Sequence, residues 1–300
     1  MKIGIIGLGD IAQKAYLPIL ATRENTELVL CTRNVNTLQK LAQKYRITQY
    51  VETVDELIAN GIDAAFVNSA TASHSEISDR LLGKGIPVYI DKPMSLNYNE
   101  CQKTVRITET NKLVAMVGFN RRFVPMIRKL KDHGQAEMII MQKNRTQFPD
   151  RTRRVIFEDF IHVVDTLRFL MDSDVQDIQV SSASKDGLLN NVVIQMNSGS
   201  CTAIGLMNRN NGVTEEMIEY MVSDQKFIVD NLTETIHFQN NSKNIIKFGD
   251  WESTLFKRGF YQIIDHFLHC VEEGISPSPS LADSLITHEI CERIVKMIGE

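Results

Sequence analysis

The sequence lacks the features that mark several classes of protein. No stretch approaches the roughly 20 consecutive apolar residues that a membrane-spanning helix needs, and the five cysteines include no CxxC pair. We therefore expect no membrane contact, no disulfide framework and no metal site. With 33 Lys and Arg against 37 Asp and Glu, the net charge of −4 leaves no overall positive charge for binding nucleic acid.

We expect no secretion signal at the beginning of the sequence. An apolar run extends only from Ile3 to Leu8 before Asp10 interrupts it, and this is shorter than the core of a signal peptide. We therefore expect a cytoplasmic protein. The sequence contains no internal repeat and no low-complexity tract.

The length of 300 residues and the hydrophobic content of 43% suit a globular chain of two domains. From residue 2 to about 119, short apolar runs alternate with segments of helical spacing, such as 36–45, 54–60 and 75–84. Alternation of strands and helices predicts an α/β fold, with a Rossmann-type doubly wound parallel sheet in residues 1–120.

The pattern changes after residue 120. It predicts a helix at about 157–171, seven strands between 175 and 248, and two closing helices at about 258–273 and 281–298. Residues 121–300 therefore form a predicted α+β domain with a large, mostly antiparallel open sheet. Packing of its C-terminal helix back on the first domain is an open alternative.

A glycine-rich loop follows the first apolar run. In "KIGIIGLGDIAQKAYL", Gly7 permits a tight turn, Gly9 lets the backbone approach a pyrophosphate, and the small Ala12 allows the next helix to pack on the strand. The start of that helix, at Asp10 and Ile11, would face the anion. We interpret the loop as a dinucleotide site; the alternative is a merely structural turn.

The end of the second apolar run, "ELVLCTRN", bears on the choice of nucleotide. NAD sites of this kind place an Asp or Glu there for the ribose hydroxyls, whereas this sequence has Thr32, Arg33 and Asn34. Arg33 could bind a 2′-phosphate through two parallel hydrogen bonds. We therefore predict NADP in preference to NAD; the alternative is that Arg33 is a solvated surface charge.

Three further stretches follow the fourth, fifth and sixth predicted strands. They are "SATASHSEI" (69–77), "DKP" (91–93) and "GFNRRF" (118–123). In an open parallel sheet, ligands bind outside the carboxyl ends of the strands. We therefore expect these loops to converge on the nicotinamide side of the cofactor site.

Together these motifs resemble the Gfo/Idh/MocA family of oxidoreductases. "GLGDIAQKAYLP", "TASH", "DKP", "VGFNRRF" and "DFIHVVDTLRFL" follow the family's order across essentially the whole chain. They look most like the MviM branch, whose members carry the label of virulence factors. The resemblance implies hydride transfer between a nicotinamide and a secondary alcohol or ketone of a sugar-like or polyol substrate.

The resemblance also assigns roles to individual residues. Lys92 matches the lysine of the family's Glu-Lys-Pro signature, which holds or polarises the substrate hydroxyl, and His162 matches the general acid/base. Imidazole titrates near neutral pH and suits proton transfer. Glu158, four residues before His162, is expected to tune it, and Asp165 at i+3 is another candidate partner.

The other expected contacts come from the same motifs. Besides the glycine loop and residues 32–34, the cofactor is expected to meet Ser69, Ala70, His74, Asp91, Lys92, Asn120 and Arg121. The substrate is expected to meet Lys92, Arg122, Asp159 and His162. His74 is expected to shape the cofactor loop rather than to do chemistry.

Three further points concern the substrate, an alternative function and the oligomeric state. The arginines of "NRTQFPDRTRR" either form a surface run or recognise an anionic substrate, such as an anionic sugar. Asp91 and Glu158 replace the family's Glu and Asp, which allows an alternative function as a nucleotide-binding redox sensor with little or no turnover. Burial of the apolar face of the large sheet favours a homodimer or homotetramer.

Overall fold

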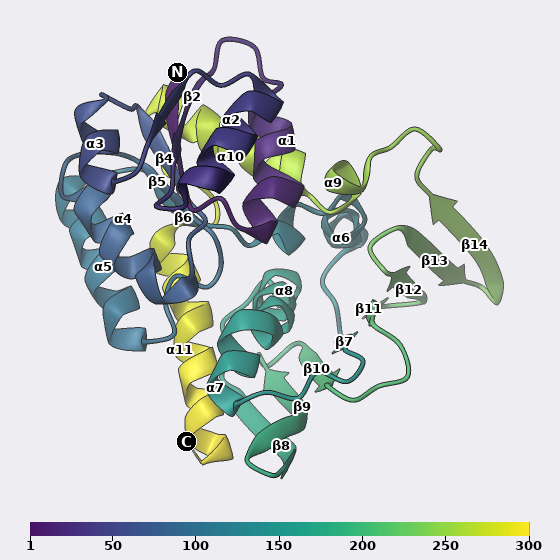
Figure 1. The fold of residues 1–300 in the computed structure, drawn as a ribbon. Helices are drawn as coiled ribbons and strands as arrows, with labels where there is room; N and C mark the ends of the chain where they lie inside the picture. Colours follow the sequence, from purple (N-terminus) through teal and green to yellow (C-terminus); the bar gives the residue numbers. More distant parts are fainter. Residues whose placement is uncertain (300) are drawn as a thin grey trace. The chain divides into compact units, whose positions relative to one another are not determined.

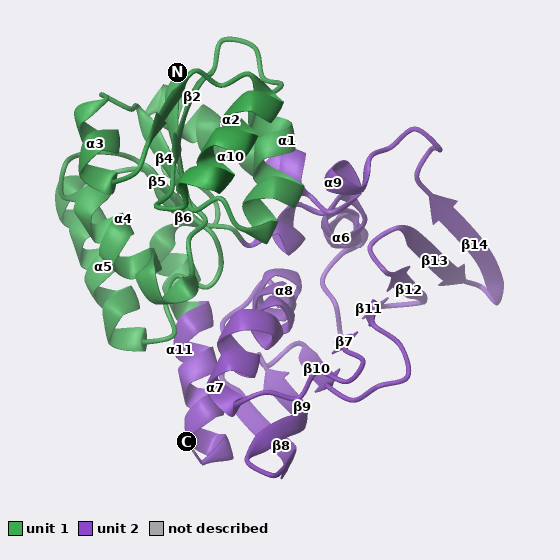
Figure 2. Cartoon of the chain, in the orientation of Figure 1, with its two compact units in different colours: residues 1–118, 263–286 green, residues 119–262, 287–300 purple. Residues whose placement is uncertain are grey.

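The computed structural model describes residues 1–299 and contains two compact units (Figures 1 and 2). The first unit comprises residues 1–118 and 263–286, and the second comprises residues 119–262 and the chain from 287 onward. The functional division of the sequence at 120/121 stays a prediction.

The first unit holds a six-stranded sheet in which every neighbouring pair is parallel, in the order β3-β2-β1-β4-β5-β6. β4, β5 and β6 are buried along their whole length, which explains why they read as unbroken apolar runs. The strand order reverses between β1 and β4, where doubly wound sheets bind ligands. The strands are β1 (Lys2–Ile6), β2 (Glu27–Cys31), β3 (Gln49–Val51), β4 (Ala64–Val67), β5 (Val88–Ile90) and β6 (Ala115–Val117). The predicted doubly wound sheet is confirmed.

The helices of the first unit follow the predicted segments with small shifts at their ends. They include α2 (Val35–Tyr45), α3 (Val54–Ala59), α4 (His74–Leu82) and α5 (Tyr98–Asn111). α4 ends at a C-cap on Gly83, and Gly85 takes a positive φ of 78° in the next turn. Phe267 of α10 (Phe260–Glu273) packs on Phe66 and Tyr89, with ring centroids 5.3 and 5.5 Å away.

The helix after the glycine loop contains a π turn. Ala12–Tyr16 forms this turn and leads into α1 (Leu17–Leu20), and the Leu17 N–H donates to the Ala12 carbonyl. Pro18, the second residue of α1, has no N–H to donate. The bonding pattern therefore changes from i+4 to i+5 just before the proline.

The second unit is built on an eight-stranded sheet, in the order β14-β13-β12-β11-β7-β10-β9-β8. Among the pairs of this sheet in the described residues, only β7–β10 is parallel. The strands are β7 (Met138–Asn144), β8 (Asp177–Lys185), β9 (Leu188–Asn197), β10 (Thr202–Asn208), β11 (Glu215–Val222), β12 (Gln225–Asp230), β13 (Glu234–Gln239) and β14 (Ser242–Lys247). The predicted, mostly antiparallel sheet is confirmed, but the central strand β7 was not predicted from the sequence.

One long helix of the second unit packs against this sheet. A π turn, Val155–Phe160, leads directly into α8 (Ile161–Met171), which packs on β7 and β10. A Cβ added to Gly205 of β10 would lie 2.7 Å from Val163 Cγ1, so the glycine allows the close approach. The helix predicted at 157–171 is present, and its first turn is wider than an α turn.

The remaining helical segments are short, apart from the last one. They are η2 (Thr71–Ser73), η3 (Asn120–Phe123), α6 (Pro125–Arg128), η4 (Lys129–His133), α7 (Thr152–Arg154), α9 (Thr254–Lys257) and α11 (Leu281–Ile298). Within residues 1–299, no helix combines the length and the apolar character that crossing a membrane would require.

Candidate active site

A large cavity lies at the carboxyl edge of the parallel sheet in the first unit. Its volume is about 1060 Å³, and the loops after β1, β2, β3 and β4 line it. The lining includes nine of the predicted cofactor residues: Gly7, Gly9, Asp10, Ile11, Thr32, Arg33, Asn34, Ser69 and Ala70. The residues expected from three separate motifs therefore come together in one place.

Glycine is suited to the two positions of the loop for different structural reasons. Gly7 has a φ of 81°, and a Cβ there would lie 2.4 Å from the Ser69 backbone nitrogen. Gly9 has no such constraint, because an added Cβ would meet nothing within 4 Å. Gly7 thus permits the turn against the loop after β4, and Gly9 leaves the wall of the cavity bare for a phosphate.

Asn68 is a buried polar residue of the cavity lining that was not predicted from the sequence. It follows β4, lines the cavity and is only 3% exposed. Within residues 1–299, neither its amide nitrogen nor its amide oxygen has a hydrogen-bond partner. A buried amide without partners is costly, so this donor and acceptor fit a bound nucleotide. A polar residue directly after the apolar run "AAFV" was the available signal.

The end of β2 sets the charge around the cavity. Burial raises the pKa of the Cys31 thiol to about 11, so Cys31 is a neutral wall residue. The Asn34 side chain caps α2 by accepting from the Thr37 N–H at 3.0 Å. Arg33 is the charged residue of this segment in the cavity lining.

Asp91 of the "DKP" loop is held by a buried tyrosine pair. The Tyr16 hydroxyl donates to Asp91 Oδ1 at 2.8 Å and lies 3.2 Å from the Tyr89 hydroxyl. Burial and the neighbouring Asp91 raise the pKa of Tyr16 well above its usual value, so the hydroxyl stays a donor. Lys92, the next residue, therefore follows an anchored position at the end of β5.

His74 joins the loop after β4 to the same "DKP" loop. Its Nδ1 lies 2.8 Å from the Pro93 carbonyl oxygen, and its Nε2 lies 2.8 Å from the Ser69 carbonyl oxygen. Both carbonyls can only accept, so the protonated ring would satisfy both and the neutral ring one. His74 thus holds two loops in place, and with Ala12, Asp91 and Lys92 it stands outside the set of cavity-lining residues.

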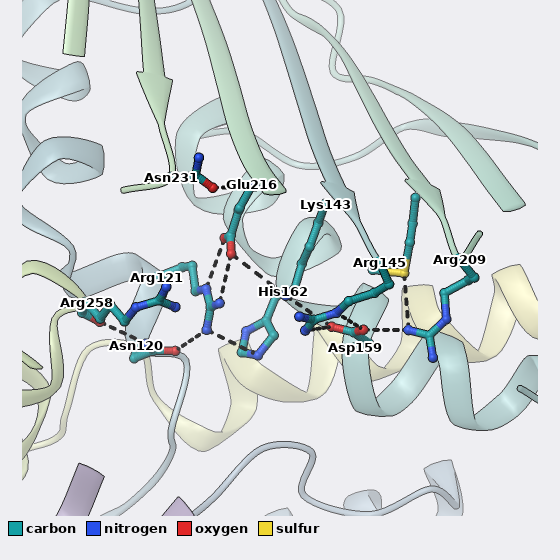
Figure 3. Close-up of polar contacts among 11 residues, drawn as sticks. Asn120, Arg121, Lys143, Arg145, Asp159, His162, Arg209, Glu216, Asn231 and Arg258 are labelled. Carbon is teal, nitrogen blue, oxygen red and sulfur yellow. Dashed lines mark hydrogen bonds and ion pairs between the residues drawn. The ribbon is translucent and has the colours of Figure 1, made fainter. Parts of the chain in front are cut away.

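The second unit contains a buried network of charged residues, shown in Figure 3. We call it the basic cluster: Arg121, Lys143, Arg145 and Arg209 with Asp159 and Glu216. These residues come from η3, from β7 and the residues after it, from the end of β10, from the π turn before α8 and from β11. The topology of the sheet brings them together although they span 95 positions from Arg121 to Glu216.

Each carboxylate of the basic cluster binds more than one cation. Arg121 donates to both oxygens of Glu216 at 3.1 and 2.9 Å, and Arg145 donates to both oxygens of Asp159 at 2.8 Å. Lys143 Nζ lies 3.1 Å from Asp159 and 3.8 Å from Glu216. Arg209 contacts Asp159 at 2.5 Å.

The cations control the pKa values of the cluster. Burial alone would raise the pKa of Glu216, but Arg121 and Lys143 lower it to about 2. Burial likewise opposes the hydrogen bonds from Arg145 and the charge of Lys143, which hold the pKa of Asp159 well below its usual range. Burial lowers the pKa of Lys143 to about 8. The attraction of Glu216 opposes this change, and the repulsion from Arg121 adds to it.

His162 adjoins this cluster. It is 5% exposed, and its Nε2 lies 3.3 Å from Arg121 Nη1. A guanidinium can only donate, so the Nε2 atom accepts and the ring proton resides on Nδ1. In that tautomer the Nε2 lone pair accepts the hydrogen bond from Arg121.

The other predicted residues of the second unit have defined contacts. Arg122 donates to both oxygens of Asp165 at 2.9 and 2.7 Å, and Arg154 contacts the half-buried Glu158 at 3.2 Å. Asn120 Nδ2 donates to the Arg258 carbonyl at 2.8 Å, and its Oδ1 accepts from Arg121. The cluster thus includes the predicted Arg121 and Asp159, whereas Lys143, Arg209 and Glu216 were missed.

Comparisons with known proteins identify the family. The pattern described as "Oxidoreductase family, NAD-binding Rossmann fold" (Gfo/Idh/MocA) matches residues 1–119, and "YceM-like, C-terminal domain" matches residues 125–240. The protein YceM of Salmonella typhimurium is 30% identical over 98% of this chain and 97% of its own length. The chain belongs to the Gfo/Idh/MocA family of oxidoreductases.

Two further relatives extend this result. A crystal structure of the dehydrogenase MviM from Clostridium difficile has a TM-score of 0.95 and 30% identity, and the match covers 99% of both chains. An inositol 2-dehydrogenase of Rhizobium meliloti is 24% identical over 100% of this chain and 97% of its own length. The expected oxidoreductase is confirmed, with a family pattern described as NAD-binding, and the homologous inositol dehydrogenases are consistent with action on CH–OH groups.

Proposed function

We propose that this protein is an NADP-preferring dehydrogenase that acts on a secondary alcohol or ketone of a sugar-like or polyol substrate. The observation that carries the proposal is the cavity beside the glycine loop, where Arg33 stands in place of the usual ribose-binding acid. The polyol part is supported by the name of the homologous inositol 2-dehydrogenase. Glu52 also lines the cavity, and it is the residue that would favour NAD instead.

Three side chains carry the reaction in this proposal. The nicotinamide, when bound, supplies the acceptor or donor of the hydride. Lys92 donates a hydrogen bond to the substrate oxygen and orients it, and His162 is the general base that takes the hydroxyl proton. Glu158, which also contacts Arg154, is assigned the tuning of His162 by the family resemblance. In the reverse reaction His162 returns the proton.

The assembly and location belong to the same proposal. Apolar side chains such as Met138 of β7 and Val193 of β9 are each 39% exposed on the large sheet, which supports burial against a second copy. We propose a homodimer or homotetramer in the cytoplasm. Light scattering of the purified protein would contradict the assembly if it gave the 34.1 kDa mass of one chain.

The nucleotide preference is tested with Arg33→Ala and a control, Arg46→Ala, which lies outside the cavity lining. Loss of a charge-assisted contact to a 2′-phosphate is expected to weaken NADP binding by about 10- to 100-fold and to leave NAD binding unchanged. Equal effects on both nucleotides would contradict the preference for NADP.

The reaction is tested with NADP or NADPH and a panel of sugars, polyols and sugar acids. Lys92→Ala and His162→Ala are each expected to lower kcat/KM for any substrate found by at least about 100-fold. Unchanged turnover in Lys92→Ala would remove Lys92 from the mechanism. Tight nucleotide binding with no turnover on any hydroxyl substrate would favour the redox sensor instead.

A further inference from the structure

The basic cluster of the second unit has more cations than carboxylates. Four basic side chains meet two carboxylates, and both carboxylates have lowered pKa values. At neutral pH the cluster therefore carries a net positive charge inside a poorly hydrated site. An excess of buried charge is costly unless another ion compensates it.

Arg145 gives an anion access to this cluster. Its side chain is 33% exposed, compared with 10% for Arg121, 4% for Lys143 and 2% for Arg209. Arg145 uses Nε and Nη2 to hold Asp159. Its Nη1 group meets no protein acceptor in residues 1–299, so two N–H donors are available to a ligand.

The cluster is continuous with the proposed proton-transfer residue. Arg121 binds Glu216 through Nε and Nη2 and approaches His162 through Nη1. An anion held by the cluster would therefore belong to the molecule that reacts near His162. A remote regulatory ion would not need this connection.

We propose that the basic cluster binds an oxyanion of the substrate, either a carboxylate or a phosphate. The substrate is then an anionic derivative of a sugar or polyol, a step that rests on the proposed function. Planar guanidinium groups suit both oxyanions, because each offers parallel N–H donors. Asp159 and Glu216 hold the guanidinium groups in place, and the ligand supplies the missing negative charge.

The first test is binding alone, with inorganic phosphate as the probe. Calorimetry is carried out on the protein saturated with nucleotide, so that the glycine loop is filled. Arg145→Gln is expected to raise the Kd for phosphate by about 10- to 100-fold, and Arg145→Lys to have an intermediate effect. The matched control is Arg151→Gln, an exposed arginine of the same segment, which is expected to leave the Kd unchanged.

The fold of Arg145→Gln is expected to persist, because Asp159 keeps its contacts with Lys143 and Arg209. Melting curves and circular dichroism of Arg145→Gln check this point, and Arg145→Lys supplies the answer if Arg145→Gln is unstable. Absence of phosphate binding in the wild type would overturn the proposal. Equal Kd values for the Arg145→Gln and Arg151→Gln variants would do the same.

The second test compares hydride transfer to three probes: a neutral polyol, a uronic acid and a sugar phosphate. The better of the two anionic probes identifies the oxyanion, and its advantage in kcat/KM is expected to disappear in Arg145→Gln. Preference for the neutral polyol with no effect of Arg145→Gln would overturn the anion site and leave the proposed function standing. Arg145-dependent phosphate binding without hydride transfer to any probe would support the site and count against the proposed function.

Discussion

Glu216 offers the sharpest physical test of the charged network. It is 7% exposed, accepts two hydrogen bonds from Arg121 and lies 3.8 Å from Lys143. Glu216→Gln keeps the shape of the side chain and removes its charge. Arg121 and Lys143 would then be left with Asp159 as the one carboxylate of the basic cluster.

The size of the effect follows from the proton affinity of Glu216. Its pKa falls from 4.5 to about 2 on folding, and at about 1.4 kcal/mol per tenfold change this corresponds to roughly 3 kcal/mol. The folded pKa is lowered, so this stability is present above pH 4.5 and is lost as the pH falls towards 2. Removing one partner of a buried ion pair generally lowers the free energy of unfolding by about 3–5 kcal/mol. We therefore expect Glu216→Gln to lower the free energy of unfolding by about 3 kcal/mol at pH 7.

Removing Lys143 should behave differently. In Lys143→Met, Asp159 keeps Arg145 and Arg209, Glu216 keeps Arg121, and the repulsion between cations is relieved. The expected loss is less than about 1 kcal/mol. In the double variant, Lys143→Met should recover part of the loss caused by Glu216→Gln, since one uncompensated charge is gone.

Urea unfolding followed by circular dichroism measures these differences. Hydrogen exchange of peptides from β7 and β11 assigns them to the second unit, because a chain of two units need not unfold in one step. Glu219→Gln is the control on the same strand, where the partly exposed pair with Lys226 predicts a change within about 0.5 kcal/mol. The reasoning is refuted if Glu216→Gln loses no more than Glu219→Gln, or if Lys143→Met loses as much as Glu216→Gln.

Three more predictions concern other parts of the molecule. The wild-type free energy of unfolding should rise between pH 8 and 10.5, because the pKa of Lys143 is about 8 in the folded state and 10.5 in the unfolded state. Urea titrations of Lys143→Met should lack this rise. Gly7→Ala should weaken nucleotide binding by at least about 100-fold in calorimetry, because its Cβ would lie 2.4 Å from the Ser69 nitrogen. Tyr16→Phe should destabilise the first unit by about 1.5–3 kcal/mol in thermal unfolding, because Asp91 loses a charge-assisted hydrogen bond.

Each of these predictions has a control and a contrary outcome. A pH profile of Lys143→Met parallel to that of the wild type would exclude Lys143 as the titrating group. Gly61 also has a positive φ, but a Cβ added there would meet nothing within 4 Å. An equal loss of nucleotide affinity in Gly61→Ala and Gly7→Ala would therefore contradict the steric argument. Tyr50→Phe removes the hydroxyl of a tyrosine that is 47% exposed, and an equal loss there would contradict the role of Tyr16.

The sequence predicts best those strands and helices in which the burial of the residues matches their polarity. β4, β5 and β6 are buried on both faces and read as continuous apolar runs. β3 is short and partly exposed, and no stretch of the sequence was assigned to the third strand. β7 was missed because its last residues, Lys143 and Asn144, are polar although they are buried at the centre of the sheet.

The two parts of the candidate site differ in the same way. The nucleotide loop could be predicted because its demands fall on the main chain, and only glycine meets them at Gly7. The basic cluster could not, because its residues come from separate strands and helices and are stable only in each other's presence. The π turn at Val155–Phe160 also has no local sequence signal, so the faces of Glu158 and Asp159 could not be assigned from an α-helical repeat.

Asp91 bears directly on whether the enzyme or the sensor is the better hypothesis. It replaces a glutamate of the family signature, and its shorter side chain was the reason to doubt the loop. The structure supplies a partner, because the buried Tyr16 hydroxyl donates to Asp91 at 2.8 Å and Tyr89 lies behind it. A shorter acid that is still bound can hold the backbone before Lys92 in one place, so the substitution at Asp91 gives no support to the sensor. The case for lost turnover then rests on Glu158 alone, and it can be decided by the kinetics of Glu158→Gln with the first substrate found.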